Sequence, residues 1–227
     1  MSTQASPSFR RQLEERISDV EISKGERTRA TIRWATVAVL EEIGYASFTL
    51  DTVAKRANVS RPAIYQYYGS QRDCVLDVLS EFLNVVVDFV ERDGNARRAK
   101  AGDLLTSVVD TNREYIAFYR ENATLVERVR ELREEIPELI ALQQEINKQW
   151  AERLAKHIRK NTALSSKQAL FTAYALESMI DDFLRELFVL KNPHLAGLNM
   201  SDDELAVSLS EFWARAAYGV TPLKSTS

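Results

Sequence analysis

Residues 49–68 read TLDTVAKRANVSRPAIYQYY, and this stretch decides the fold of the N-terminal part of the chain. Its spacing predicts two short helices, over about residues 50–57 and 61–68, joined by a tight turn at Asn58–Val59. Ala54 is small enough to let the two helices cross closely. The apolar residues that fall on the inward side of the pair are Leu50, Val53, Ala54, Ala57, Val59 and Ile64. Such a pattern is typical of a helix-turn-helix.

The outward residues of the second short helix suit contact with DNA. An arginine such as Arg61 can donate two hydrogen bonds to a guanine edge, Gln66 can read adenine, and tyrosine hydroxyls suit phosphate oxygens. Two short helices with a few arginines also occur as a plain helical corner, so the spacing alone leaves that alternative open.

The charge distribution favours the DNA-binding interpretation. From Lys24 to Arg72 the sequence holds eight bases and four acids, so +8 − 4 = +4, whereas the formal net charge of the whole 227-residue chain is −3. A basic end on an acidic body can attract DNA locally while the rest of the surface resists non-specific binding.

The overall composition indicates a globular protein. The chain is 45% hydrophobic and 28% charged, and no apolar run approaches the roughly 20 residues of a membrane span. A single cysteine, Cys74, fits a reducing compartment, so we expect a cytoplasmic protein without membrane attachment. No glycine cluster suggests a nucleotide loop, and His157 and His194 lack metal-ligand spacing, so we expect no cofactor and no metal.

Glycine, proline and capping residues fall where helices begin or end, which predicts an all-α chain of about nine helices. We expect residues 1–24 to form a flexible N-terminal arm with a short helical run over 12–20. A helix-turn-helix domain of three helices is expected over 25–70, packed on a larger helical domain over 71–227. The expected helices lie at about residues 26–43, 50–57, 61–68, 71–91, 103–121, 123–134, 137–161, 167–190 and 202–219.

Residues 44–74, with Ile32 and Ala35 upstream, resemble the DNA-binding domain of TetR-family transcriptional repressors. The rest of the chain resembles that family only in its length and its helical character. The positions that match the family pattern are Gly44, Thr49, Val53, Ala54, Ala57, Val59, Ser60, Ile64, Tyr65, Tyr67 and Ser70.

The resemblance implies a homodimeric repressor that binds a palindromic double-stranded DNA operator and is released by a ligand bound in the C-terminal domain. By position it assigns phosphate contacts to Thr49, Tyr65 and Tyr67, and base contacts to Arg61, Ala63 and Gln66. Three residues depart from the pattern. Pro62 and Asn58 each replace a glycine, and Gln71 replaces a phosphate-binding lysine, whose role either passes to Arg72 or is lost.

The helices of the larger domain carry polar residues inside apolar arcs. Buried polar groups need partners, so these residues either anchor a small lipophilic effector in a mostly apolar pocket or pair with neighbouring helices. Glu177 and Asp181 share a helix face and favour a cationic ligand only if no base pairs with them. The candidate ligand residues are Asn112, Tyr115, Tyr119, Gln143, Asn147, Trp150, Tyr174, Glu177 and Asp181.

The last two long helices, over 167–190 and 202–218, offer more apolar surface than one subunit readily covers, so we expect them to form the homodimer interface. The alternative is that this surface is covered within the monomer. The acidic pairs of the chain diverge around their helices, and therefore we expect no enzyme. Two further alternatives remain: an activator or ligand-independent DNA-binding regulator, and a helical adaptor that binds protein.

Overall fold

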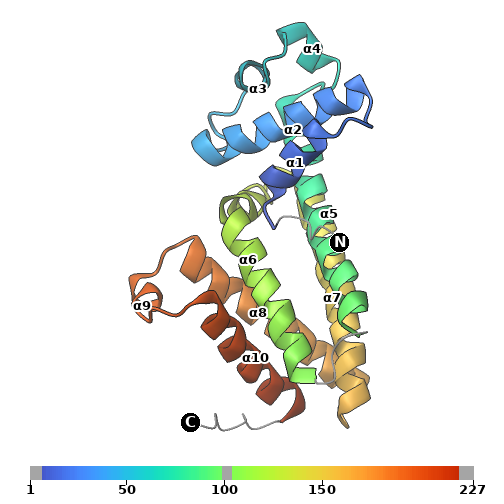
Figure 1. Ribbon diagram of the computed structural model, residues 1–227, viewed down its shortest axis with the longest axis vertical. Coiled ribbons are helices and arrows are strands. Elements are labelled where there is room, and N and C mark those ends of the chain that lie inside the picture. Colours follow the sequence, from blue (N-terminus) through green and yellow to red (C-terminus); the bar gives the residue numbers. More distant parts are fainter. Residues whose placement is uncertain (1–6, 99–103, 220–227) are drawn as a thin grey trace. The chain divides into compact units, whose positions relative to one another are not determined.

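The computed structural model describes residues 7–98 and 104–219, and every regular element in these ranges is an α-helix (Figure 1). The all-α prediction is therefore confirmed. The helices are α1 (Phe9–Ser18), α2 (Lys24–Ile43), α3 (Leu50–Ala57), α4 (Arg61–Tyr65), α5 (Gln71–Arg98), α6 (Leu104–Glu131), α7 (Pro137–Asn161), α8 (Ser166–Phe188), α9 (Pro193–Ala196) and α10 (Asp202–Tyr218).

The chain divides into two compact units whose boundary differs from the one expected at residue 70. The first unit comprises the chain up to Val86 together with Glu121–Gln143, and the second comprises Val87–Arg120 together with the chain from Gln144. Helices α5, α6 and α7 each contribute residues to both units. The first turns of α5 therefore belong with the helix-turn-helix, because apolar residues of α5 complete its small core.

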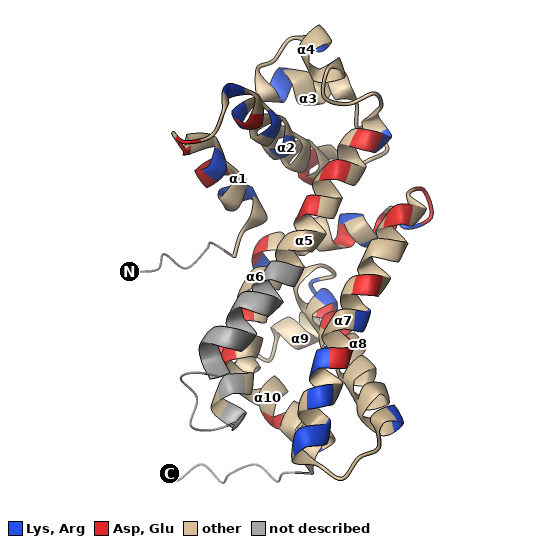
Figure 2. Ribbon diagram, turned by 90° about the vertical axis from the view of Figure 1, so that its right-hand side faces the viewer, with Lys and Arg blue, Asp and Glu red and all other residues tan. Residues whose placement is uncertain are grey.

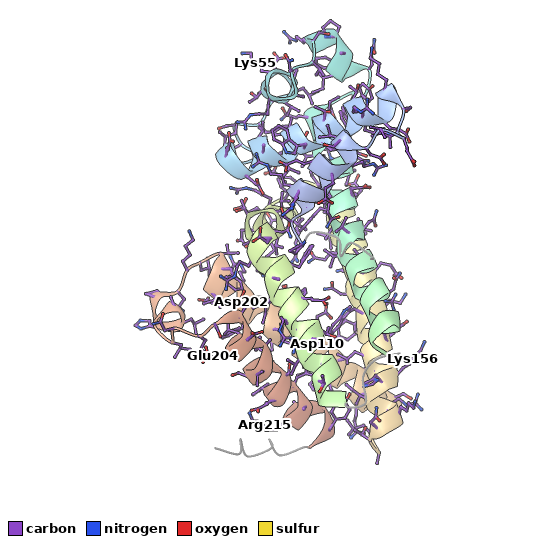
Figure 3. The ribbon with its side chains drawn as sticks, in the orientation of Figure 1. Lys55, Asp110, Lys156, Asp202, Glu204 and Arg215 are labelled. Carbon is purple, nitrogen blue, oxygen red and sulfur yellow. The ribbon has the colours of Figure 1, made fainter. Side chains whose placement is uncertain are left out.

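Local capping explains where several helices begin. The Ser23 hydroxyl accepts from the backbone of Glu26 at the start of α2, and the Glu26 carboxylate accepts from the backbone of Ser23. The same reciprocal box opens α10 at Ser201 and Glu204. Acidic residues occupy the first turn of α10 and Arg215 its last turn, which complements the helix dipole (Figure 3).

The first unit contains α1 to α4 and has a continuous apolar core. α2 contacts both α1 and α3, and α3 contacts α4. From α2 the fully buried residues include Ile32 and Leu40, and from α5 they include Leu79 and Phe82. Phe82 packs against Phe9 with ring centroids 5.5 Å apart. The core thus joins residues from both sides of the helix-turn-helix sequence.

Residues 9–18 form α1 in place of the flexible arm that we expected over residues 1–24. Its residues Phe9 and Leu13 are buried, and the Trp34 indole N–H donates to Glu14 at 2.8 Å. The Arg10 guanidinium lies over the Trp34 ring. Two apolar residues at i and i+4 on a short, charged helix are too weak a signal to predict that the helix packs on the core. Residues 1–6 of the expected arm lie outside the described residues.

Helix α6 bends at Asn122, where the backbone leaves the helical region at φ −120° and ψ 16°. This position separates the two helices that the sequence predicts over 103–121 and 123–134. The Asn122 side chain is buried, accepts from the Phe9 backbone N–H at 2.9 Å, and donates to the Pro7 carbonyl at 2.7 Å. The hydrogen bonds of the Asn122 side chain to another segment compensate for the interruption of the helix, and this explains the bend.

In the second unit α8 packs against α10, and α6 is tied to α10 by a hydrogen bond. The Asn112 amide of α6 donates to the Ser210 hydroxyl at 2.8 Å, and both side chains are buried. Within the described ranges, no helix is both long and apolar enough to cross a membrane.

Candidate functional site

The turn between α3 and α4 fixes which side of α4 faces outward. Asn58 adopts the left-handed conformation, with φ 54° and ψ 42°, so it performs the role expected of the glycine that it replaces. The Ser60 hydroxyl caps α4 by accepting from the Ala63 backbone N–H at 3.3 Å, and Pro62 occupies the first turn. Ile64 is fully buried, and therefore the other residues of this short helix point away from the core.

The residues assigned to DNA lie where the sequence predicts an outward face. Arg61, Tyr65 and Gln66 are exposed, and Ala63 and Tyr67 are half-buried. Thr49 is also exposed, and its hydroxyl caps α3 by accepting from the Thr52 backbone N–H at 3.1 Å. Thr49, Arg61, Tyr65 and Gln66 are therefore accessible to a partner in solution.

Arg61, the first residue of α4, lies beside a carboxylate of α3. Its Nε is 3.0 Å from Oδ1 of Asp51, and the two side chains are 70% and 45% exposed. Asp51 could not be singled out from the sequence, because nothing in the spacing shows that α3 brings its first turn next to the start of α4.

Arg72, the candidate replacement for the missing lysine, also has an acidic neighbour. One of its terminal nitrogens donates to Glu138, at the start of α7, over 2.5 Å. Both side chains are substantially exposed, so the pair contributes little to stability and Arg72 can exchange partners. Hydrogen bonding with Arg72 holds the pKa of Glu138 below its usual value.

A polar network that the sequence did not reveal holds the helix-turn-helix against α5. Arg33 of α2 donates two hydrogen bonds of 2.8 Å to Asp77 of α5, and the Tyr68 hydroxyl donates to Asp77 at 2.6 Å. Burial alone would raise the pKa of Asp77, but the bonds from Arg33 and Tyr68 outweigh it and hold the pKa below its usual value. Because Tyr68 follows α4 closely, this network positions the end of the recognition segment.

Figure 2 marks basic residues on α2, α3 and α4 in blue. Lys55 of α3, labelled in Figure 3, is exposed and has no ion-pair partner among the described residues. Its neighbour Arg56 instead makes a two-pronged contact with Glu42. Lys55 is thus a candidate phosphate contact beyond those predicted from the sequence.

In the second unit, three of the candidate ligand residues meet between α6 and α8. The Tyr115 hydroxyl donates to Asp181 at 3.2 Å, and the rings of Tyr115 and Tyr119 meet edge to face at 6.1 Å. Tyr119 is buried and its ring also contacts Phe188 at 6.4 Å. Burial, and secondarily the charge of Asp181, raise the pKa of Tyr115 well above its usual value.

Glu177 lies one turn before Asp181 on α8 and contributes a second carboxylate to this region. Its Oε2 is buried and accepts no hydrogen bond. Burial, and then repulsion from Asp181, raise the pKa of Glu177 from 4.5 to about 7. The protein therefore holds Glu177 in an environment that disfavours its charge.

Two further candidate ligand residues are bonded to partners outside that group. Gln143 belongs to the first unit, where it accepts from Arg133 at 2.5 Å, and Asn112 is bonded to Ser210. Tyr174 is 39% exposed on α8. Asn147 and Trp150 are half-buried on α7. Helical periodicity predicts the side of the helix on which each residue lies, but it does not predict which neighbouring helix packs against that side. Among the described residues, no three metal-ligating side chains lie together.

Comparisons with known proteins agree with this geometry. Residues 32–78 match the family described as bacterial regulatory proteins, tetR family. No curated protein matches the chain by sequence. This chain therefore carries a TetR-type helix-turn-helix domain, and the proteins of that class are DNA-binding transcriptional regulators.

Solved structures share the all-helical fold at low sequence identity. A TetR-like transcriptional regulator from Rhodococcus sp. RHA1 has a TM-score of 0.64 at 17% identity, covering 88% of this chain and 100% of its own. NalD, the secondary repressor of the MexAB-OprM multidrug efflux pump in Pseudomonas aeruginosa, has a TM-score of 0.62 at 17% identity, with coverages of 86% and 97%. The fatty acid degradation regulator FadR from Bacillus halodurans has a TM-score of 0.61 at 17% identity, with coverages of 82% and 94%.

Proposed function

We propose that the protein is a homodimeric repressor that binds a palindromic operator through α3 and α4 and leaves it when a small lipophilic molecule binds the second unit. The observation that carries the DNA-binding part is the exposed row of donors on α4, with Ile64 buried behind it. Arg61 and Gln66 supply base contacts together with the small side chain of Ala63. Thr49, Tyr65, Tyr67 and Arg72 supply phosphate contacts.

Exposed aromatic side chains on α8 and α10 support the homodimer. Phe171 is 75% exposed and Phe212 is 50% exposed, and Tyr174 and Val207 are also exposed on the same two helices. A second copy of the chain removes this apolar surface from water and pairs two recognition helices, as a palindromic site requires. Trp213 of α10 is only 5% exposed and packs inside its own subunit.

The effector part of the proposal is supported by the aromatic and acidic group on α6 and α8. Tyr115, Tyr119, Glu177 and Asp181 combine apolar rings with a few polar atoms, the composition of a small-molecule site. Asn147 and Trp150 of α7 remain proposed members of the same site. FadR, which shares the fold, is described as a regulator of fatty acid degradation, and fatty acids are lipophilic.

Selection of DNA from a random library with the purified protein tests the proposal. We expect a palindromic sequence whose affinity falls steeply as salt rises, because phosphate contacts release counterions. Arg61→Ala should weaken binding and relax one base preference, whereas Tyr65→Phe should weaken all sequences alike. Failure to enrich any sequence at low salt would favour a protein-binding adaptor instead. Whether the regulator represses or activates follows from the position of the operator relative to the promoter.

A further inference from the structure

Asp51 lies beside the residue that is best placed to read a base. It belongs to the first turn of α3, and its Oδ1 is 3.0 Å from Nε of Arg61 on α4. That distance suits an ion pair, but Oδ1 accepts no hydrogen bond although it is shielded from solvent. A small rotation of the guanidinium completes the bond and satisfies this oxygen.

The contact engages Nε of Arg61 and leaves both of its terminal nitrogens available. An arginine reads guanine when two of its N–H groups donate to O6 and N7 together. A guanidinium held through Nε can offer its two terminal nitrogens end-on, in a fixed plane. The Arg61 side chain is 70% exposed. Without Asp51 it would become ordered only when DNA binds, and the entropy lost at that moment would weaken its contact with the base.

We propose that Asp51 is a positioning residue that orients the Arg61 guanidinium for a guanine in each half-site of the operator. This inference rests on the proposed DNA-binding function, and it adds which base Arg61 reads and which residue prepares it. Asp51 does not itself contact DNA, since a carboxylate repels the phosphates.

The two effects of Asp51 on DNA binding have opposite signs, which makes the proposal testable. Removing its charge should strengthen binding to unrelated DNA by about threefold, because one negative charge leaves the interface. Loss of its ion pair with Arg61 should lower the preference for guanine at one base pair by about fivefold, the amount expected of one exposed ion pair. If Asp51 only reduced the positive charge of Arg61, removing it would change the affinity for all DNA sequences equally.

Asp51→Asn is the informative variant because asparagine keeps the shape of the side chain. Its affinities for the selected operator and for operators changed at single base pairs are compared with those of the wild type. Glu42→Gln is the matched control: Glu42 is also an exposed carboxylate that pairs with an arginine of this unit, Arg56. The control should bind every sequence slightly more tightly and keep all base preferences.

The double variant Asp51→Asn/Arg61→Ala completes the test. If Asp51 acts through Arg61, the double variant shows the same base preferences as Arg61→Ala alone. An unchanged guanine preference in Asp51→Asn, or a preference that survives in Arg61→Ala, would overturn the positioning role while leaving DNA binding in place. A wild-type protein that selects no sequence would overturn the proposed function and this inference with it.

Discussion

The most direct test of the first unit is Asn122→Ala, because one buried side chain ties α6 to the segment before α1. The substitution removes the acceptor for the Phe9 N–H and the donor to the Pro7 carbonyl. An unsatisfied buried group costs about 1–3 kcal/mol. We assign about 2 kcal/mol to the buried Phe9 N–H and about 1 kcal/mol to the Pro7 carbonyl, which water can reach.

A gain in helix propensity offsets part of the stability that Asn122→Ala removes. Alanine favours the helical backbone over asparagine by about 0.7 kcal/mol, so α6 gains some local stability at the bend. The losses outweigh this gain, and we expect the free energy of unfolding of the first unit to fall by about 2 kcal/mol. For a chain of this size that corresponds to a lowering of the melting temperature by roughly 4–8 °C.

Two measurements check Asn122→Ala independently. Circular dichroism gives the melting temperature, and limited trypsin digestion reports on α1, which carries arginines at positions 10, 11 and 16. If opening precedes cleavage, a loss of 2 kcal/mol raises the cleavage rate in α1 by about 30-fold. Asn161→Ala is the control, since Asn161 is exposed and makes one bond to a carbonyl of its own helix. Equal melting and equal digestion of Asn122→Ala and the wild type would refute the role of this side chain.

Three further substitutions test other parts of the structure. Asp77→Asn should lower the free energy of unfolding by about 2 kcal/mol at pH 7 and by progressively less as the pH falls below about 4, because the depressed pKa of Asp77 adds stability only while the carboxylate is charged. Glu177→Gln should raise the free energy of unfolding by about 1 kcal/mol at pH 8 and change it little at pH 4, where the wild-type carboxyl is mostly protonated in both states. Phe212→Glu should give monomers in sedimentation with weak operator affinity, and a dimer that persists would contradict the proposed interface.

Each of these predictions has an outcome that opposes it. A pH-independent effect of Asp77→Asn would mean that the network with Arg33 and Tyr68 stabilises the fold by packing alone. If Glu177→Gln destabilised the protein at pH 8, the charged form of Glu177 would have a partner that outweighs its burial. Arg215→Glu, on the exposed surface of α10, is the charge control for Phe212→Glu and should remain dimeric.

Most of the fold could be predicted from the sequence because helix ends are set by nearby residues. Capping serines, the glycine that follows α2 and the proline that opens α7 act over a few positions, so they can be recognised in a single sequence. The outward face of α4 followed from one fact, that Ile64 is apolar and faces inward. Even the bend at Asn122 coincides with the gap between two predicted helices.

Long-range pairing could not be predicted in the same way. The position of α1 depends on Asn122, which is 113 residues away from Phe9 in the sequence. Gln143 and Asn112 sit in apolar arcs as predicted, but their partners, Arg133 and Ser210, belong to positions that periodicity does not connect. A helical pattern specifies which side of a helix is apolar, but the packing partner of that side depends on the tertiary fold.

The charge of the DNA-binding region also depends on long-range pairs that a count along the sequence does not include. Counting residues 24–72 gives +4, yet Arg61 lies beside Asp51, and Arg72 pairs with Glu138, an acid outside the counted range. When Arg72 contacts a phosphate it therefore exchanges one anionic partner for another. Its contribution to the free energy of DNA binding is smaller than that of a basic side chain with no partner. Lys55, which has no such partner among the described residues, keeps its full attraction for phosphate. Affinity for arbitrary DNA is thereby restrained, so discrimination between sequences depends more on the bases that Arg61 and Gln66 reach.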